Sequence, residues 1–288
     1  ESFPTRKPFR TRYMIRLIEG RLIRRAIRTI TVGDEIARVM HERYGVARPA
    51  VIRNAQPYDG EPTPVPLLRE TIGDGDREPR RRLFVYAGRV ALGRGLPECV
   101  LAMTRIDPEQ AALVILGDGD PARLRELRAL VAEHDLGDRV HLVPAIPSGD
   151  LPGVLADADV GLMLTQPACL SYYYGLGNKL FHYVNAGIPV LVPKQPEKQK
   201  FVEAHGVGHC CDDLTPEAIA AAMQRMIDSP EWLETLKSRC REVAPTVSWQ
   251  REATTYRSIY EGVYERILFA DDPQAGWFRP WRRTWSPA

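Results

Sequence analysis

From residue 83 onward, short apolar runs alternate strictly with amphipathic segments, and this alternation limits the possible folds most strongly. The predicted strands are 83–87, 112–116, 140–143, 160–164 and 189–192. The predicted helices lie near 96–106, 121–134, 149–157, 178–186, 196–205, 216–228, 230–243 and 249–268. Because largely apolar strands are typical of a sheet buried on both faces, the pattern predicts an α/β domain with a doubly wound parallel sheet.

A shorter pattern precedes this domain. We predict a basic amphipathic helix over residues 10–30, a strand at 29–33, a helix at 34–44 closed by Gly45, and a strand at 50–54. Residues 56–82 then lose periodicity and gain proline, glycine and charge, which is typical of a linker between domains.

Composition limits the class of protein further. The 288 residues carry a net charge of +2, but residues 1–28 hold nine basic and two acidic side chains. No nucleic-acid-binding module is recognisable, so nucleic acid is not an expected partner. Five cysteines without C-x-x-C spacing indicate reduced packing residues rather than disulfides or a zinc site. No run of 18 apolar residues and no secretion signal are present, which predicts a cytoplasmic protein.

Three strand-to-helix junctions are candidate ligand sites, because doubly wound sheets bind ligands beyond the carboxyl ends of their strands. The first, residues 87–95, contains three glycines with Arg89 and Arg94 before a helix, which suits a phosphate group. Its spacing matches neither a dinucleotide fingerprint nor a Walker loop. A glycine turn with solvated arginines is the alternative.

The other two junctions are less specific on their own. Residues 116–121 contain Gly117, Asp118 and Gly119 and also suit an ordinary tight turn. In the third, Gly175 and Gly177 precede a helix that begins at Asn178. A helix N-terminus favours phosphate, although the neighbouring tyrosines also suit packing.

Together these motifs resemble family 4 glycosyltransferases of the GT-B fold. The resemblance covers about residues 83–268. It rests on the order and spacing of Gly-Arg and Arg-Gly in 88–95, Gly-Asp-Gly at 117–119, the strand at 141–147, Ala-Asp-Ala-Asp-Val at 156–160, Asn-Lys-Leu-Phe at 178–181, Ala-Gly-Ile-Pro-Val at 186–190 and Ser-Trp at 248–249.

The resemblance implies a GT-B arrangement in which one Rossmann-like domain is accompanied by a remnant of a second. Its implied parts are 1–58, the end of the acceptor-side domain; 59–82, the linker; 83–248, the domain that binds the nucleotide-sugar donor; and 249–288, a helix and Trp/Arg tail that return toward the first domain. A complete first domain needs on the order of 100 to 200 residues. We therefore expect most of that half to be missing from this sequence.

The resemblance also implies a set of donor-binding residues. These are Gly88, Arg89, Arg94, Gly117, Asp118, Val143, Ile146, Tyr174, Gly177, Asn178, Lys179 and His182. Arg89 and Arg94 would pair with the donor diphosphate, and the backbone from Val143 to Ile146 would contact the base. The donor would be a UDP-, GDP- or dTDP-sugar, with no cofactor.

No metal is expected. The pairs Asp118/Asp120 and Asp157/Asp159 imitate a D-x-D ligand motif, but their places in a glycine turn and at a strand entry favour caps and turns.

Several positions depart from the family pattern. Arg94 stands where the family usually has lysine, and Ala145 replaces a loop glycine. Tyr174 and His182 occupy the positions of two family glutamates, of which the second binds the donor ribose. A neutral histidine accepts fewer hydrogen bonds than a carboxylate, which predicts weaker donor binding or a different donor. Alternatively, His182 is a packing residue with a local partner.

The leading hypothesis is a metal-independent, retaining glycosyltransferase that transfers a sugar to a cell-surface glycan or a lipid-linked acceptor. The alternatives are a binding subunit without transfer activity and a GT-B sugar-nucleotide epimerase. The helix at 10–30 and the tail, with Trp277, Trp281 and Trp285 among arginines, suit peripheral attachment to an anionic membrane on its inner face. Packing against the missing half is the alternative for both segments.

Overall fold

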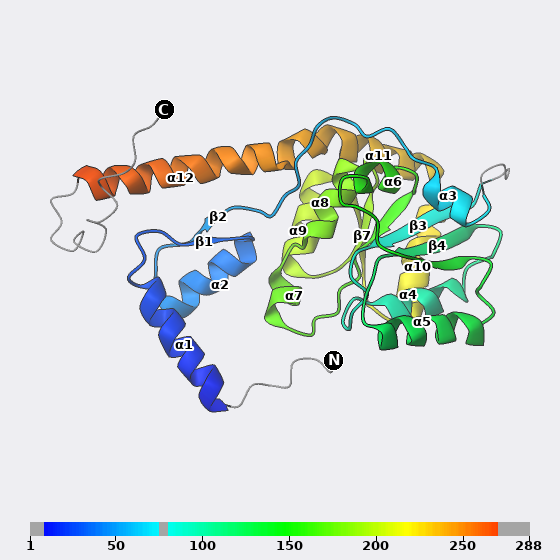
Figure 1. Cartoon of the computed structure of the whole chain (residues 1–288), viewed down its shortest axis with the longest axis horizontal. Helices are drawn as coiled ribbons and strands as arrows, with labels where there is room; N and C mark the ends of the chain where they lie inside the picture. Colours follow the sequence, from blue (N-terminus) through cyan, green and yellow to red (C-terminus); the bar gives the residue numbers. More distant parts are fainter. Residues whose placement is uncertain (1–8, 75–79, 270–288) are drawn as a thin grey trace.

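The larger part of the molecule is built on one six-stranded sheet in which all strands are parallel (Figure 1). The computed structural model describes residues 9–74 and 80–269. The strands are β3 (Arg82–Ala87), β4 (Ala111–Leu116), β5 (Val140–Val143), β6 (Val160–Leu162), β7 (Val190–Pro193) and β8 (Gly208–Cys211). Their order, β5-β4-β3-β6-β7-β8, confirms the predicted doubly wound, Rossmann-like sheet.

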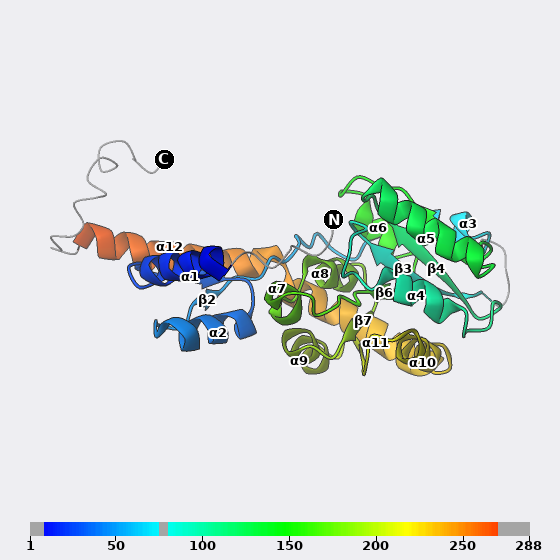
Figure 2. The ribbon, with the colours of Figure 1, turned by 90° about the horizontal axis from the view of Figure 1, so that it is seen from below.

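Helices cover both faces because the strands point alternate side chains to opposite sides. Leu83 and Val85 of β3 join the core beneath α6 (Leu151–Leu155), α8 (Asn178–Asn185) and α9 (Pro196–His205). Phe84 and Tyr86 join the core beneath α4 (Leu96–Met103), α5 (Pro121–Glu133) and α10 (Pro216–Ile227). Helix α11 (Pro230–Val243) contributes to both clusters and closes one side of the sheet. Figure 2 shows the two helical layers from below.

Four elements were not predicted, one of them the short helix η1 (Ala244–Val247). Strand β8 has the sequence GHCC, which lacks a run of apolar residues, yet it extends the sheet beside β7. The one-turn helix α7 (Leu170–Tyr174) lies in the tyrosine-rich loop. Helix α3 (Leu67–Thr71) lies in the stretch read as a linker, and its Leu68 is fully buried in the core.

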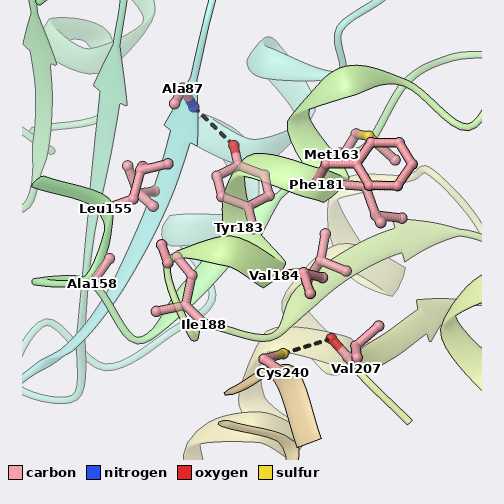
Figure 3. Close-up of a cluster of buried hydrophobic side chains, with 14 of the residues drawn as sticks. Ala87, Leu155, Ala158, Met163, Phe181, Tyr183, Val184, Ile188, Val207 and Cys240 are labelled. Atoms are coloured by element: carbon pink, nitrogen blue, oxygen red, sulfur yellow. Dashed lines mark hydrogen bonds between the residues drawn. The ribbon is translucent and has the colours of Figure 1, made fainter. Parts of the chain in front are cut away.

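Tyr183 of α8 occupies the point where β3 and β6 separate (Figure 3). Its hydroxyl accepts a hydrogen bond from Ala87 N at 2.9 Å and donates one to Leu162 O at 3.1 Å. Gly161 makes room for the ring, since a Cβ there would lie 2.3 Å from Tyr183 Cγ. The tyrosine thus satisfies two backbone groups that the diverging strands cannot pair with each other.

The N-terminal segment forms a second, small unit. It consists of α1 (Phe9–Ile23), β1 (Ile30–Thr31), α2 (Asp34–Tyr44) and β2 (Ala50–Val51), in which β1 and β2 pair in parallel. Gly45 ends α2 in a left-handed conformation, as predicted. Figure 1 shows this unit apart from the large sheet.

The prediction of a helix over the whole of 10–30 is wrong. Helix α1 ends at Ile23, and Arg24 donates a hydrogen bond to Gly20 O at 3.1 Å near this end. Residues 24–29 instead connect the helix to β1, which must reach β2 to form its ladder. Of the apolar stripe expected on the helix, only Ile23 is buried, whereas Leu22 is 65% exposed.

Helix α12 (Trp249–Phe269) follows the short helix η1 (Ala244–Val247) and begins beside the chain that joins the two units. Trp249 N donates to Gln56 O, and Glu252 accepts from Arg53 N, both at 2.9 Å. The helix then runs away from the large sheet toward the N-terminal unit (Figure 1). The predicted Trp/Arg tail lies outside the described residues. Within the described part, no helix has the length and apolarity needed to cross a bilayer.

Candidate functional site

A cavity of about 990 Å³ opens beyond the carboxyl ends of β3, β4 and β5. This is the edge of a doubly wound sheet at which ligands bind. Six of the predicted site residues line it: Gly88, Arg89, Arg94, Gly117, Asp118 and Ile146. The first two predicted junctions therefore form the walls of a single cavity.

Glycines allow the loops after β3 and β4 to lie against each other. Gly88 N donates to Leu116 O and Val90 N to Asp118 O, both at 2.8 Å, so the backbone ladder continues past the strands. Gly117 has a φ of 150°, and a Cβ on it would lie 2.1 Å from Gly88 O. These contacts leave no space for larger residues and hold both loops at the cavity wall.

Two cations meet where the first junction faces α8. Lys179 Nζ lies against Gly88, close enough that a Cβ on that glycine would be 2.7 Å away, and 4.9 Å from the centroid of the Tyr86 ring. Burial, and then the charge of Arg94, lowers the pKa of Lys179 to about 8. Arg94 Nε is buried with no hydrogen-bond partner in the described part of the chain. Paired cations without a carboxylate partner form a site that favours an anion.

The remaining wall residues have different surroundings. The Arg89 side chain is exposed, and its carbonyl accepts a hydrogen bond from the Tyr86 hydroxyl at 2.7 Å. The Asp118 carboxylate accepts from Ala145 N at 3.3 Å, so the loops after β4 and β5 are joined across the cavity. Ala145 and Ile146 both line the cavity.

The aspartates that imitate D-x-D pairs have protein partners. Asp120 accepts from Ala122 N at 2.8 Å and caps α5, as the sequence indicated. Asp159 accepts from Leu83 N at 2.9 Å and pairs with Arg69 at 2.8 Å. Asp157 accepts from Arg69 N at 2.8 Å. The second pair therefore holds α3 against the sheet, a role that its position before β6 did not reveal.

The other predicted residues do not line this cavity. Val143 ends β5 and accepts from Gly117 N at 2.8 Å, so its carbonyl is already used. Gly177 and Asn178 are exposed at the start of α8. Tyr174 points away, and its ring packs edge-on against Tyr173 at 4.9 Å between centroids.

His182 is half-buried on α8, and the structure gives its imidazole no hydrogen-bond partner within the described residues. Burial, followed by the charge of Lys179, lowers its pKa, which keeps the ring neutral at pH 7. The local partner expected of a packing residue is therefore not seen in the described part of the chain.

Sequence reasoning missed Tyr172, which lines the cavity in place of Tyr174. The guanidinium carbon of Arg94 lies 4.7 Å from the centroid of its ring, in a cation–π contact. Residues two apart on a helix point in nearly opposite directions, so only one of these two tyrosines can face the cavity. Recognising a one-turn helix within 169–175 would have indicated Tyr172. The glycines at 175 and 177 instead made this segment resemble a loop.

Arg123 and Cys169 also line the cavity without having been predicted. Cys169 is the exposed one of the five free cysteines, and the other four are buried, which confirms the expectation of reduced packing residues for those four.

The fold and the site define a class: a Rossmann-like domain with a glycine-walled, arginine-lined cavity beyond the carboxyl ends of the strands of a doubly wound sheet. Comparison with known protein families identifies the particular family within this class. Residues 69–243 match the model described as "Glycosyl transferases group 1", so the chain belongs to this family of glycosyltransferases.

Characterised relatives agree. The chain is 26% identical over 271 residues to 2-deoxystreptamine glucosyltransferase of Streptomyces kanamyceticus, an alignment that covers 88% of this chain and 64% of that protein. It is 28% identical over 194 residues to MMP alpha-(1->4)-mannosyltransferase of Mycolicibacterium hassiacum, covering 65% and 44%. The chain thus spans less than two thirds of the length of these relatives.

Solved structures share the fold. Sucrose-phosphate synthase from Thermosynechococcus elongatus superposes with a TM-score of 0.75 at 23% identity, covering 92% of this chain and 64% of that one. Anabaena HepE in complex with UDP and glucose gives a TM-score of 0.72 at 17% identity, covering 87% and 67%. The α/β architecture is therefore that of GT-B glycosyltransferases, as the sequence motifs predicted.

Proposed function

We propose that the cavity holds the nucleoside diphosphate of a sugar donor and that the whole protein transfers the sugar from it to a glycan or lipid-linked acceptor. The observation that carries the proposal is the pair of cations at the glycine loop of the first junction: Arg94, which lines the cavity, and Lys179, whose ammonium lies against Gly88 of the cavity wall. UDP and a sugar in the structurally similar HepE support a nucleotide-sugar as the ligand class.

In this proposal the departing diphosphate lies between Arg94, Lys179 and the N-terminus of α8. Their fixed positive charge offsets the negative charge that develops as the bond between sugar and phosphate breaks. Gly88 lets the backbone approach the phosphate, and the loop at Ala145 and Ile146 contacts the base. The chemistry assigned to these residues needs no metal, and the proposed stereochemistry is retention.

Residues 83–248 form the donor-binding domain in this proposal, and residues 1–58 belong to the acceptor side, with 59–82 between them. A catalytic base from the acceptor side is not assigned. We place the protein in the cytoplasm, with the option of attachment to the inner face of a membrane.

A binding subunit without transfer activity is the second candidate. It is favoured by His182, which stands at the ribose position and presents a neutral ring instead of a carboxylate. His182→Glu separates two roles for this residue: tighter UDP binding identifies a ribose contact, and unchanged binding identifies a packing residue.

The test of the leading proposal is calorimetric titration with UDP, GDP and dTDP, together with release of nucleotide from their sugars with and without acceptor. We expect one nucleotide to bind and Arg94→Ala to weaken it by roughly tenfold to a hundredfold. Arg105→Ala, which removes an exposed arginine far from the cavity, is the matched control. Unchanged affinity in Arg94→Ala would contradict the site, and binding without release from any sugar donor would favour the binding subunit.

A further inference from the structure

Lys198, in the first turn of α9, is a fully buried lysine outside the cavity. Only 2% of its surface is exposed. Its ammonium donates three hydrogen bonds, to Tyr172 O at 2.6 Å, Gly175 O at 2.7 Å and Gln195 Oε1 at 2.6 Å. An ammonium has three donors, so its capacity is used completely.

Two of the three acceptors belong to the segment 165–175, which contributes Cys169 and Tyr172 to the wall of the donor cavity. Tyr172 and Gly175 lie in or next to α7, and Gln195 donates in turn to Thr165 O at 2.8 Å. Lys198 and Gln195 therefore attach both ends of residues 165–175 to the start of α9. Within this segment, the ring of Tyr172 carries the guanidinium of Arg94.

We propose that Lys198 is a positioning residue for the donor site: it fixes the backbone of Tyr172, and through the Tyr172 ring it orients Arg94 toward the diphosphate. This inference rests on the proposed function of the cavity and adds a residue that does not touch the ligand.

The physical case depends on the cost of a buried charge. Burial lowers the pKa of Lys198 to about 8, while Glu197 next to it acts in the opposite direction. An ammonium held by three neutral oxygens costs more than an apolar side chain of the same length. Such a residue is justified where acceptors from two separate segments, α7 with its C-cap and the start of α9, must be held in one geometry, because an apolar side chain would leave them without this donor.

Glu197 offers a matched control in the same helical turn. Its carboxylate faces the other unit, where it accepts from Asp34 N at 2.9 Å and Glu35 N at 2.7 Å at the start of α2. Glu197→Gln disturbs the same turn of α9 without touching residues 165–175. Lys194→Met, which removes an exposed lysine paired with Asp212, controls for the loss of a positive charge.

The experiment measures UDP affinity by calorimetry for Lys198→Met, Arg94→Ala and the double variant. We expect Lys198→Met to weaken UDP binding by roughly tenfold, and less than twofold when Arg94 is already alanine, because the effect passes through Arg94. Both control variants should keep affinity within twofold. Equal losses in the two backgrounds, or an equal loss in Glu197→Gln, would overturn the proposal.

Hydrogen exchange of the ligand-free protein supplies a readout that does not depend on nucleotide binding. The amides of residues 170–175 should exchange at least tenfold faster in Lys198→Met, and at the wild-type rate in Glu197→Gln. Unchanged exchange in Lys198→Met would overturn the positioning role. If the wild-type protein bound none of the three nucleotides, the donor-site assignment would fail, whereas the exchange data would still decide whether Lys198 holds the loop.

Discussion

At the scale of single residues, the state of Lys179 sets a pH dependence. Its pKa is lowered to about 8 by burial and by Arg94, and its other near neighbours are the Tyr86 ring and the neutral His182. A bound diphosphate favours the protonated amine, so binding is accompanied by proton uptake above pH 8.

We therefore predict that UDP affinity falls roughly tenfold between pH 7 and pH 9, since the amine must be reprotonated before the anion binds. Titration calorimetry across this range in two buffers of different ionisation enthalpy measures both the affinity and the proton uptake. Lys179→Arg should bind with little change over the same range, because arginine stays protonated. A wild-type affinity that is constant from pH 7 to pH 9 would contradict this prediction.

Gly117 tests the packing of the two glycine loops. In Gly117→Ala, the new Cβ would meet Gly88 O at 2.1 Å, and the φ of 150° is strained for alanine. We expect a loss of about 3 kcal/mol or more in the free energy of unfolding, measured by urea denaturation, together with loss of UDP binding. Gly137→Ala is the matched control, because a Cβ there meets nothing within 4 Å and should change stability by less than about 0.5 kcal/mol. Equal stability of the two variants would refute the close approach.

At the scale of elements, Asp159 joins three parts of the fold. It pairs with Arg69 of α3 at 2.8 Å and with Lys237 of α11 at 2.9 Å, and it accepts from Leu83 N of β3. Burial alone would raise the pKa of this carboxyl, but Lys237 and Arg69 together bring it below its ordinary value. A lowered pKa in the folded state contributes stability that is present at neutral pH and is lost as the pH falls through that value.

Asp159→Asn should therefore lower the free energy of unfolding at pH 7 by about 2 to 3 kcal/mol, because Arg69 and Lys237 lose the buried carboxylate that they share and keep only Asp157 and Glu234, respectively, as partners. Urea denaturation should show the difference from wild type shrinking below about pH 4, where the wild-type carboxylate is protonated in the unfolded and then in the folded state. Asp212→Asn, at an exposed pair with Lys194, is the control and should leave the stability close to that of the wild type, because solvent screens an exposed pair. A difference that stayed constant down to pH 2 would argue against the assigned charge.

At the scale of the whole molecule, α1 combines exposed apolar and basic side chains. Met14, Leu17 and Ile18 are each more than half exposed, and Arg24 and Arg25, which follow the end of the helix, are exposed too. Helices of this composition bind anionic lipid surfaces. Helix α2 contacts α1 through a 2.6 Å hydrogen bond from the Tyr44 hydroxyl to Glu19 and through the Tyr44 ring, which lies against Gly20.

We predict that the protein co-sediments with vesicles of phosphatidylserine and phosphatidylcholine and not with phosphatidylcholine alone. Arg25→Glu should weaken this binding roughly tenfold, since each basic residue at the surface contributes about 1 kcal/mol. Arg105→Glu, in the domain that contains the large sheet, changes the net charge by the same amount and should have little effect. Equal recovery with neutral vesicles, or none with either, would contradict a lipid-binding role for α1.

Sequence patterns gave the main elements within a few residues where apolar periodicity was strong. Strands β3, β4 and β5 were predicted almost as observed, because runs such as ALVIL have no other stable place than a buried sheet. Strand β8 was missed, because GHCC acquires its structure from pairing with β7 rather than from its own composition. Helix α3 was missed for a similar reason: its five residues are held by Asp157 and Asp159 from elsewhere in the chain.

The sequence by itself determined the doubly wound sheet, the glycine loops at the first two junctions and the family, since these depend on local spacing and on residue types that tolerate few conformations. Only the tertiary structure decided that Tyr172 rather than Tyr174 reaches the cavity, that Lys179 lies against Gly88, and that Lys198 holds the tyrosine segment. Along the chain, Lys179 is about 90 residues from Gly88, and Lys198 is about 25 residues from Tyr172. The contact between Lys179 and Gly88 arises because β3 lies beside β6 in the sheet, and the contact between Lys198 and Tyr172 arises because α9 packs on α7. Neither arrangement can be predicted from the periodicity of a single segment.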